Sequence, residues 1–316
     1  MTVEPRLHLD APFSAGARLD LDKDQAHYLV NVMRRSAGDT LRVFNGEDGE
    51  WRAEIAEAGK RRAALTLVEQ TRAQTAAPDL HLFFSPVKKA RTDFIVEKAT
   101  ELGASAITPV MTRRTMADRV RTDRLQALVR EAAEQTERLD LPGVGEPVSL
   151  VQMLKGWDDG RHLIFCDEAG DEASTPWGGE AGRAAPILEA LTRYAPHSTP
   201  GLPSRGGREA ESASVHSSDA TSFSPVEVST RGRNSPPFPS GGEGAKSGPR
   251  DRTTARTGGE SANARKWAIL IGPEGGFDPE ERPLLRGQAF VVPVTLGPRI
   301  LRADTAVAAA MSVWQA

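Results

Sequence analysis

Hydrophobic residues in the N-terminal part of the chain recur at alternate positions in short runs, the period expected of strands with one buried face. These runs occupy residues 41–44, 50–55 and 64–68. The first two flank Asn45-Gly46, a dipeptide that favours a hairpin turn. Residues 24–35 have the pattern of one helix. The pattern therefore predicts a small β-barrel with a helix over residues 1–72, followed by a polar linker.

From residue 78 onward, apolar strands alternate with amphipathic helices. Strands are predicted at 80–84, 106–110, 162–166, 267–271 and 290–294, and helices at 92–102, 123–138, 186–194 and 306–314. Gly103 follows a helix at the position where a left-handed glycine commonly ends one. Alternating strands and helices predict an α/β fold with a mainly parallel sheet that is covered on both faces.

Residues 196–265 interrupt this alternation. They are rich in Ser, Gly, Pro, Thr and Arg, and their few large apolar residues follow neither a helical nor a strand period. Such a segment does not bury enough apolar surface to offset its chain entropy. We expect a disordered insert that the fold tolerates, and mixed-charge contacts to RNA are the less favoured alternative.

Composition and charge narrow the class of protein without identifying it. The net charge of −3 gives no overall sign of a polyanionic partner, so RNA binding would have to depend on local basic clusters. The single cysteine, Cys166, excludes an intramolecular disulfide. The first ten residues carry no apolar run, and no stretch approaches the roughly 20 apolar residues of a membrane span. We therefore expect a cytoplasmic protein.

Two loops after predicted strands carry the candidate chemistry. The first, IGPEGGF at 271–277, has glycines that let a ligand lie close to the backbone, and Asp278 with Pro279 then resembles a helix start. It lacks both the Walker A and the dinucleotide-binding spacing. The second loop, LGPRILRADTA at 296–306, gathers arginines, a carboxylate and a hydroxyl. Taken singly, each is also explained as a tight turn or as a polar loop in which Asp304 or Thr305 caps a helix.

Together the two loops closely resemble the C-terminal signature of the RsmE family of 16S rRNA uridine-N3 methyltransferases, in the SPOUT superfamily. Further segments resemble this family in the same order: 5–7 and 27–34 in its PUA-like barrel, 85–88, 97–104, 113–115 and 131–138. The similarity spans nearly everything except the insert. Asp304 stands where the family usually has Glu, and Ala303 where it often has Thr.

The resemblance implies a PUA-like RNA-binding barrel over 1–72 and a SPOUT methyltransferase domain over 78–316, interrupted by the insert. It implies a trefoil knot near the C-terminus, S-adenosylmethionine as the cofactor without a metal, a homodimer whose interface includes the last helix, and the small ribosomal subunit as partner. The cofactor-binding residues it implies are Ile271, Gly272, Pro273, Glu274, Gly275, Gly276, Leu296, Gly297, Ile300, Leu301, Arg302, Thr305 and Ala306.

Methylation at N3 of uridine requires that a weakly acidic proton leaves and that charge on the base is stabilised. Arg302 is the first candidate for charge stabilisation and Arg138 the second, because guanidinium groups are planar and permanently charged. Asp304 or Glu134 is the candidate proton acceptor. For each of these residues a purely structural role is the alternative. The candidate RNA-binding residues are Arg6, Arg34, Arg35, Lys88, Arg91 and Arg114.

Two other functions stay open from the residues alone. One is a SPOUT enzyme that makes a ribose 2′-O-methyl group or another base methyl on a different RNA. The other is an RNA-binding module that kept the fold without catalysis. The N-terminal barrel favours uridine-N3 methylation of 16S rRNA over another SPOUT activity. The intact motif loops disfavour a non-enzymatic module.

Overall fold

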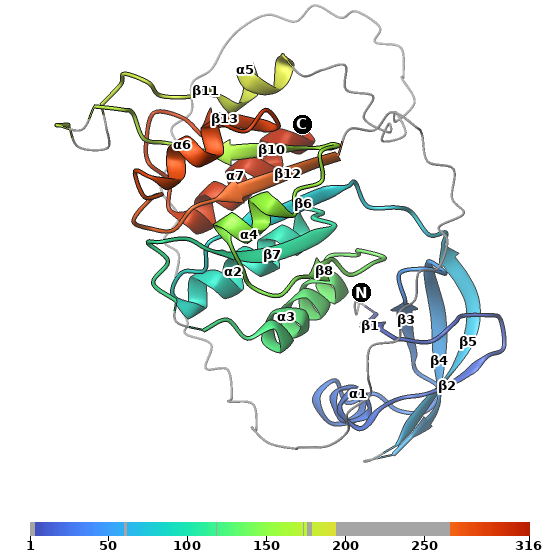
Figure 1. Ribbon diagram of the computed structural model, residues 1–316. Coiled ribbons are helices and arrows are strands. Elements are labelled where there is room, and N and C mark those ends of the chain that lie inside the picture. Colours follow the sequence, from blue (N-terminus) through green and yellow to red (C-terminus); the bar gives the residue numbers. More distant parts are fainter. Residues whose placement is uncertain (1–3, 60–61, 118, 173, 176–178, 194–265) are drawn as a thin grey trace, which may run out of the picture. The chain divides into compact units, whose positions relative to one another are not determined.

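The computed structural model describes residues 4–59, 62–117, 119–172, 174–175, 179–193 and 266–316. The expected insert at 196–265 lies outside these residues. Within the described part of the chain, every helix is too short or too polar to cross a lipid bilayer. Two separate sheets organise the described residues, one in the N-terminal barrel and one in the larger α/β part (Figure 1).

The N-terminal sheet has the strand order β1-β3-β4-β5-β2. Its strands are β1 (Arg6–His8), β2 (Arg18–Asp20), β3 (Thr40–Phe44), β4 (Glu50–Ala58) and β5 (Ala63–Arg72). The predicted hairpin of β3 and β4 is confirmed, with Val43 opposite Trp51. The alternating apolar residues, among them Leu41, Ile55 and Leu65, meet in one buried core. Strands β1 and β2 escaped prediction because three residues are too few to show a period.

The helix predicted at 24–35 is shorter and irregular. The α-helix α1 (Lys23–His27) begins at Asp22 with a capping box closed by Gln25, and a π-helical turn, η1 (Tyr28–Val32), follows it. Ala26 and Leu29 pack into the barrel core. Arg34 then takes a positive φ of 55°, a backbone conformation that a non-glycine residue rarely adopts. The helix therefore ends before the Arg34-Arg35 pair.

The second sheet has the order β11-β13-β10-β12-β6-β7-β8, with β9 beside β7, and its described pairings are all parallel. Its strands are β6 (Leu80–Phe84), β7 (Ala106–Met111), β8 (Gly143–Val144), β9 (Val148–Ser149), β10 (Arg161–Cys166), β11 (Ala185–Pro186), β12 (Lys266–Ile271) and β13 (Val291–Thr295). The α/β fold predicted from the alternation is confirmed. The trefoil knot stays a prediction.

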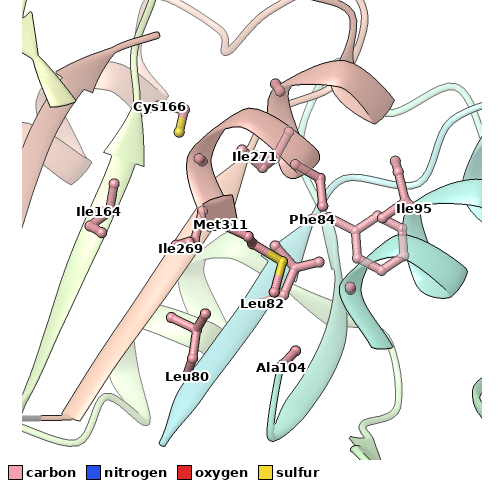
Figure 2. Packing of buried hydrophobic residues seen from close by; sticks show 14 of the residues in the cluster. Leu80, Leu82, Phe84, Ile95, Ala104, Ile164, Cys166, Ile269, Ile271 and Met311 are labelled. Carbon is pink, nitrogen blue, oxygen red and sulfur yellow. The ribbon is translucent and has the colours of Figure 1, made fainter. Parts of the chain in front are cut away.

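Helices cover both faces of this sheet (Figure 1). They are α2 (Lys89–Glu101), α3 (Thr122–Gln135), α4 (Leu150–Lys155), α5 (Ile187–Thr192), α6 (Glu281–Arg286) and α7 (Ala303–Gln315). Alternate residues of β12 divide between two clusters: Ile269 and Ile271 pack on one face, and Leu270 on the other. Figure 2 shows the first cluster, where Met311 of α7 lies among the strand residues. Both faces are therefore buried, as the continuous apolar runs predict.

Helix α7 buries much of its apolar surface inside the chain. Ala306, Val307, Ala310 and Met311 are buried in the chain's own core, against α2, α5 and β12. The apolar residues of the last helix were expected to serve a dimer interface. Ala308, Ala309, Val313 and Trp314 of this helix stay partly exposed, and its role in a dimer interface stays a prediction.

Candidate active site

A cavity of about 1330 Å³ opens where β10, β12 and β13 end. This is the edge at which open parallel sheets commonly bind ligands. Both motif loops line it, together with the segment that follows β10. Of the predicted cofactor-binding residues, the cavity wall includes Ile271, Gly272, Pro273, Glu274, Gly275, Gly276, Ile300, Leu301, Arg302 and Ala306. Leu296, Gly297 and Thr305 lie in or beside the second loop but not in that wall.

The glycines of the first loop are not equivalent. A Cβ on Gly272 would approach the Phe277 ring to 2.5 Å, and Phe277 is itself buried against Phe165. Gly276 has a φ of +68°, which favours glycine. A Cβ on Gly275 would meet only the Arg114 side chain, at 3.8 Å. Gly272 and Gly276 are thus required by the loop itself, whereas Gly275 leaves open space on the cavity side.

The helix start expected at Asp278 lies further along the chain. Helix α6 begins at Glu281, and the Asp278 carboxylate accepts a hydrogen bond from the Glu280 N–H at 3.0 Å. That bond is the largest cause of the lowered pKa of Asp278. Asp278 therefore closes a turn before α6 and does not cap the helix.

Glu281, four residues beyond the end of the first motif loop, is a site residue that the sequence analysis did not identify. Its buried carboxylate accepts hydrogen bonds from the backbone N–H of Arg113 at 2.8 Å and of Asp278 at 3.0 Å. The Arg114 guanidinium donates to the Gly275 carbonyl at 3.0 Å. The arginine pair after β7 is consequently fastened to the first motif loop.

Glu168 is a second residue that sequence reasoning missed. Its carboxylate accepts a hydrogen bond from the Leu296 N–H at 2.8 Å, which holds the second motif loop. The other carboxylate oxygen, Oε2, is buried without a hydrogen-bond partner among the described residues, and Glu168 lines the cavity. Burial raises the pKa of this carboxyl. The signal available in the sequence was an acidic pair directly after the buried strand that ends at Cys166.

Asp167, the other member of that pair, also lines the cavity and holds α6 in place. It is 3% exposed and accepts hydrogen bonds from Arg282 at 2.9 Å and from Arg286 at 2.7 Å. Both arginines belong to α6 and also line the cavity. Because both guanidinium partners of this buried carboxylate come from α6, Asp167 fixes α6 against the segment after β10.

Arg302 lies at the cavity wall as the N-cap residue of α7, with an extended backbone. Within the described residues its guanidinium makes no ion pair or hydrogen bond. Asp304 lies in the first turn of α7 and accepts from its own neighbour Thr305 N–H at 2.9 Å. Arg91 lies 4.0 Å from Asp304 and pairs with Glu274. The N-cap of α7 is Arg302, so neither Asp304 nor Thr305 caps this helix, contrary to what the structural alternative had predicted.

Glu134 and Arg138 are not brought together with this cavity. Arg138 is buried and uses its guanidinium on Asp140 at 2.8 Å and on the Thr100 carbonyl at 2.9 Å. The Glu134 carboxylate accepts the His8 N–H at 3.0 Å, and burial raises its pKa. Both residues thus have structural partners away from the cavity wall, which is the alternative that the sequence left open.

Arg6 corrects the expected RNA-binding set. Its side chain is 7% exposed, bound to Glu50 at 2.8 Å, and it donates to carbonyls at the end of α3. Those carbonyls belong to Ala133, Glu134 and Arg138. A guanidinium with these donors engaged inside the protein is not available to phosphates, so Arg6 joins the barrel to α3 instead.

The other predicted RNA-binding residues remain at the surface or at the site. Arg34 is exposed, and Arg35 is half-buried with a buried Nε that lacks a partner among the described residues. Lys88 and Arg114 line a second, smaller cavity, while Arg91 and Arg114 line the large one. RNA binding by these residues stays a prediction.

Comparisons with known proteins agree with this architecture. A family model described as an RNA methyltransferase domain matches residues 74–185 and 246–315, and one described as an RNA methyltransferase PUA domain matches residues 21–68. A protein of Rickettsia conorii named ribosomal RNA small subunit methyltransferase E is 25% identical over 97% of this chain and 93% of its own length. A protein of Synechocystis with the same name is 34% identical over 44% of this chain and 46% of its own length.

A solved structure gives the same picture of the fold. The ribosomal RNA small subunit methyltransferase E of Neisseria gonorrhoeae, bound to S-adenosyl methionine, superposes with a TM-score of 0.65 at 20% identity. The match covers 99% of this chain and 97% of that one. With the family model spanning most of the α/β part and the motif loops converging on one cavity, the chain belongs to the RNA methyltransferase family, with a PUA domain at its N-terminus.

Proposed function

We propose that this enzyme uses S-adenosylmethionine to methylate N3 of a uridine in the 16S rRNA of the small ribosomal subunit. The observation that carries the proposal is the meeting of the two motif loops at one cavity, with Arg302 of the second loop in its wall. The relatives named small subunit methyltransferase E support the substrate, and the solved relative bound to S-adenosyl methionine supports the cofactor.

The cavity residues fit this cofactor. The cavity volume of about 1330 Å³ is ample for a ligand of that size. Ile271, Ile300 and Leu301 offer apolar contacts to a purine, and the open side of Gly275 leaves room beside the backbone. The Oε2 atom of Glu168 makes no hydrogen bond among the described residues and lies 3.8 Å from the Arg183 guanidinium, so it can accept from a hydroxyl or amine donor.

S-adenosylmethionine supplies an electrophilic methyl group on a sulfonium. The protein must hold the uridine in line with that group, and positioning of this kind is a large part of the rate enhancement. Arg302 faces the cavity without a partner among the described residues, so its guanidinium is available to stabilise charge on the uridine oxygens as the N3 proton leaves. Asp304, in the first turn of α7, is the nearby candidate proton acceptor.

The remaining parts of the proposal concern the assembly. Because N3 is a base-pairing position, the target uridine must be unpaired or flipped out of its helix. The family resemblance implies a homodimer, and a ribosomal substrate implies action in the cytoplasm. Gel filtration with light scattering would test the dimer, and a monomer that retains full activity would contradict it.

Primer extension across 16S rRNA tests the activity, since a methyl at N3 blocks pairing and stops the polymerase. We expect one stop in rRNA from cells with the gene, its loss on deletion, and its return with the wild-type gene. Gly275→Val should not restore the stop, because its side chain would fill ligand space while the chain still folds. Nucleoside mass spectrometry that showed a ribose 2′-O-methyl in place of 3-methyluridine would contradict the proposal.

A further inference from the structure

A second cavity of about 520 Å³ adjoins the first. The two share Arg114, Pro273 and Glu274 in their walls, so the first motif loop separates them. The far wall of the second cavity comes from the start of α2 and from the segment that leads into α3. Its volume lies within the usual range for small-ligand sites.

The lining of this second cavity is strongly cationic. Its six basic residues, together termed the basic groove, are Lys88, Lys89, Arg114, Arg119, Arg121 and Arg124. The two lining carboxylates are already neutralised, because Asp93 pairs with Arg124 and Glu274 pairs with Arg91. Within the part of the chain that the structure describes, Lys88, Lys89 and Arg119 have no ion-pair partner. The groove therefore carries uncompensated positive charge beside the cofactor cavity.

The groove also presents apolar surface. Met116 is 82% exposed, more than any other large hydrophobic residue in the described part of the chain, and it lies in the wall with Val87 and Leu125. A flexible thioether at the mouth of a cationic groove suits contact with the face of an unstacked base. Cations beside apolar surface match single-stranded nucleic acid, which offers phosphates and base faces together.

We propose that the basic groove binds the single-stranded RNA that flanks the target nucleotide. Lys88, Lys89 and Arg119 contact its phosphates, and Met116 contacts a neighbouring base. Arg114 forms the shared wall, where its hydrogen bond to the Gly275 carbonyl links the RNA strand to the cofactor loop. This proposal rests on the RNA methylation proposed above and adds the surface that positions the substrate.

The test compares two full-length triple variants with the same change in charge. The groove variant is Lys88→Glu with Lys89→Glu and Arg119→Glu. The control variant is Lys155→Glu with Arg193→Glu and Lys266→Glu, three exposed cations away from both cavities. The probes are a fluorescent single-stranded RNA, small ribosomal subunits from the deletion strain, and S-adenosylmethionine for calorimetry.

The groove variant should bind RNA about tenfold or more weakly than wild type, and the salt dependence of log K should flatten by about 2, for three lost phosphate contacts. Its S-adenosylmethionine affinity and melting temperature should match wild type. An RNA affinity and salt dependence equal to wild type, or an equal loss in the control variant, would overturn the proposal. So would competition by a polyglutamate peptide as strong as that by RNA.

The same experiment distinguishes a failure of the groove proposal from a failure of the proposed uridine-N3 methylation. Failure of the uridine-N3 activity would appear as a missing methyl mark with the wild-type chain, whereas the groove is judged by RNA affinity alone. A smaller second comparison uses Met116→Ala, which leaves every charge in place. It should weaken RNA binding without changing the salt dependence, and a changed salt dependence would contradict the assigned contact with a base.

Discussion

Two sets of arginines in this enzyme look alike in sequence and differ in what surrounds them. At the junction between the barrel and α3, Arg6 and Arg138 are buried and donate to carboxylates and backbone carbonyls. At the cofactor cavity, Arg302 is exposed and has no partner among the described residues. All three were predicted to be functional, Arg302 and Arg138 in charge stabilisation and Arg6 in RNA binding. Only Arg302 keeps its hydrogen-bonding capacity for a ligand.

The two kinds of site differ in whether the guanidinium hydrogen-bond donors are free to bind a ligand. A buried guanidinium is stabilised by the partners that replace its hydration, so it cannot also serve a substrate without leaving them unpaired. A guanidinium at a cavity wall keeps its donors for charge that develops during a reaction. An Arg→Ala substitution should therefore lower stability at the junction and lower the reaction rate at the cavity.

The largest effect is expected at Arg302. Because its guanidinium is available for the transition state, Arg302→Ala should lower kcat and kcat/KM by similar factors, about 10²–10³, and leave cofactor affinity nearly unchanged. Arg302→Lys should restore only part of the rate, since an ammonium does not present two parallel donors. Steady-state kinetics on small subunits, with calorimetry for the cofactor, measure both. Full turnover, or a defect that disappears at saturating S-adenosylmethionine, would break the contrast.

The matching change at the junction should act on stability. Arg6→Ala leaves the fully buried Glu50 with fewer partners and three carbonyls without a donor. Loss of one partner of a buried pair costs about 3 kcal/mol. Chemical denaturation should show that loss, while kcat of the folded fraction stays near wild type below the unfolding transition. A stable Arg6→Ala protein with weakened RNA binding would return Arg6 to the RNA-binding set.

A pair of carboxylates repeats the contrast on a smaller scale. Glu50 bonds Arg6, Arg42 and Thr71, whereas one buried oxygen of Glu168 makes no hydrogen bond among the described residues and lies 3.8 Å from Arg183. If that oxygen accepts a donor from the cofactor, Glu168→Gln should weaken S-adenosylmethionine binding about tenfold, the magnitude of one hydrogen bond to a charged group. Calorimetry measures the affinity. An unchanged affinity would assign Glu168 only to the Leu296 N–H.

The same variant makes a prediction about pH. Burial raises the pKa of the Glu168 carboxyl, so the folded state favours its protonated form. Its contribution to stability is complete below the ordinary glutamate pKa of about 4.3 and is lost as pH rises through the raised value. Glu168→Gln stays neutral throughout, so it should raise Tm at neutral pH and not at acidic pH. A variant whose Tm falls at neutral pH would contradict this assignment.

The α/β alternation was readable from the sequence because each long strand of the sheet buries both faces and each covering helix repeats its apolar positions. The elements that escaped were too short to show a period, among them β1, β2, α4 and α6. The capping box of Ser149 and Gln152 was the one local signal for α4. Some helix boundaries differ from the predicted ones because the backbone conformation decides where a helix begins. Helix α7 begins at Ala303, directly after the extended backbone of Arg302, and not at the predicted residue 306.

The candidate site was predictable as far as its motifs are contiguous. The glycines of the first loop and Arg302 meet at the cavity as expected. Glu168 was missed because the strands that bring it beside Leu296 are more than a hundred residues apart in the chain. Arg6 was misassigned for the same reason, since its carbonyl partners lie at the end of α3. Hydrogen-bond partners that the fold brings together from distant parts of the chain cannot be predicted from a local sequence pattern.

The smallest effect is expected from a change that touches neither region. Deletion of residues 200–257 removes most of the expected insert, between the end of α5 and the start of β12. The segment has no core-forming pattern in its sequence, and the entropy of loop closure depends only weakly on length. The deletion should leave both the methyl mark and Tm close to wild type, measured by primer extension and calorimetry. Restoring the segment with its residues in scrambled order is the matched control. A lost mark that the natural segment rescues and the scrambled one does not would give the insert a sequence-dependent role beyond the two regions compared here.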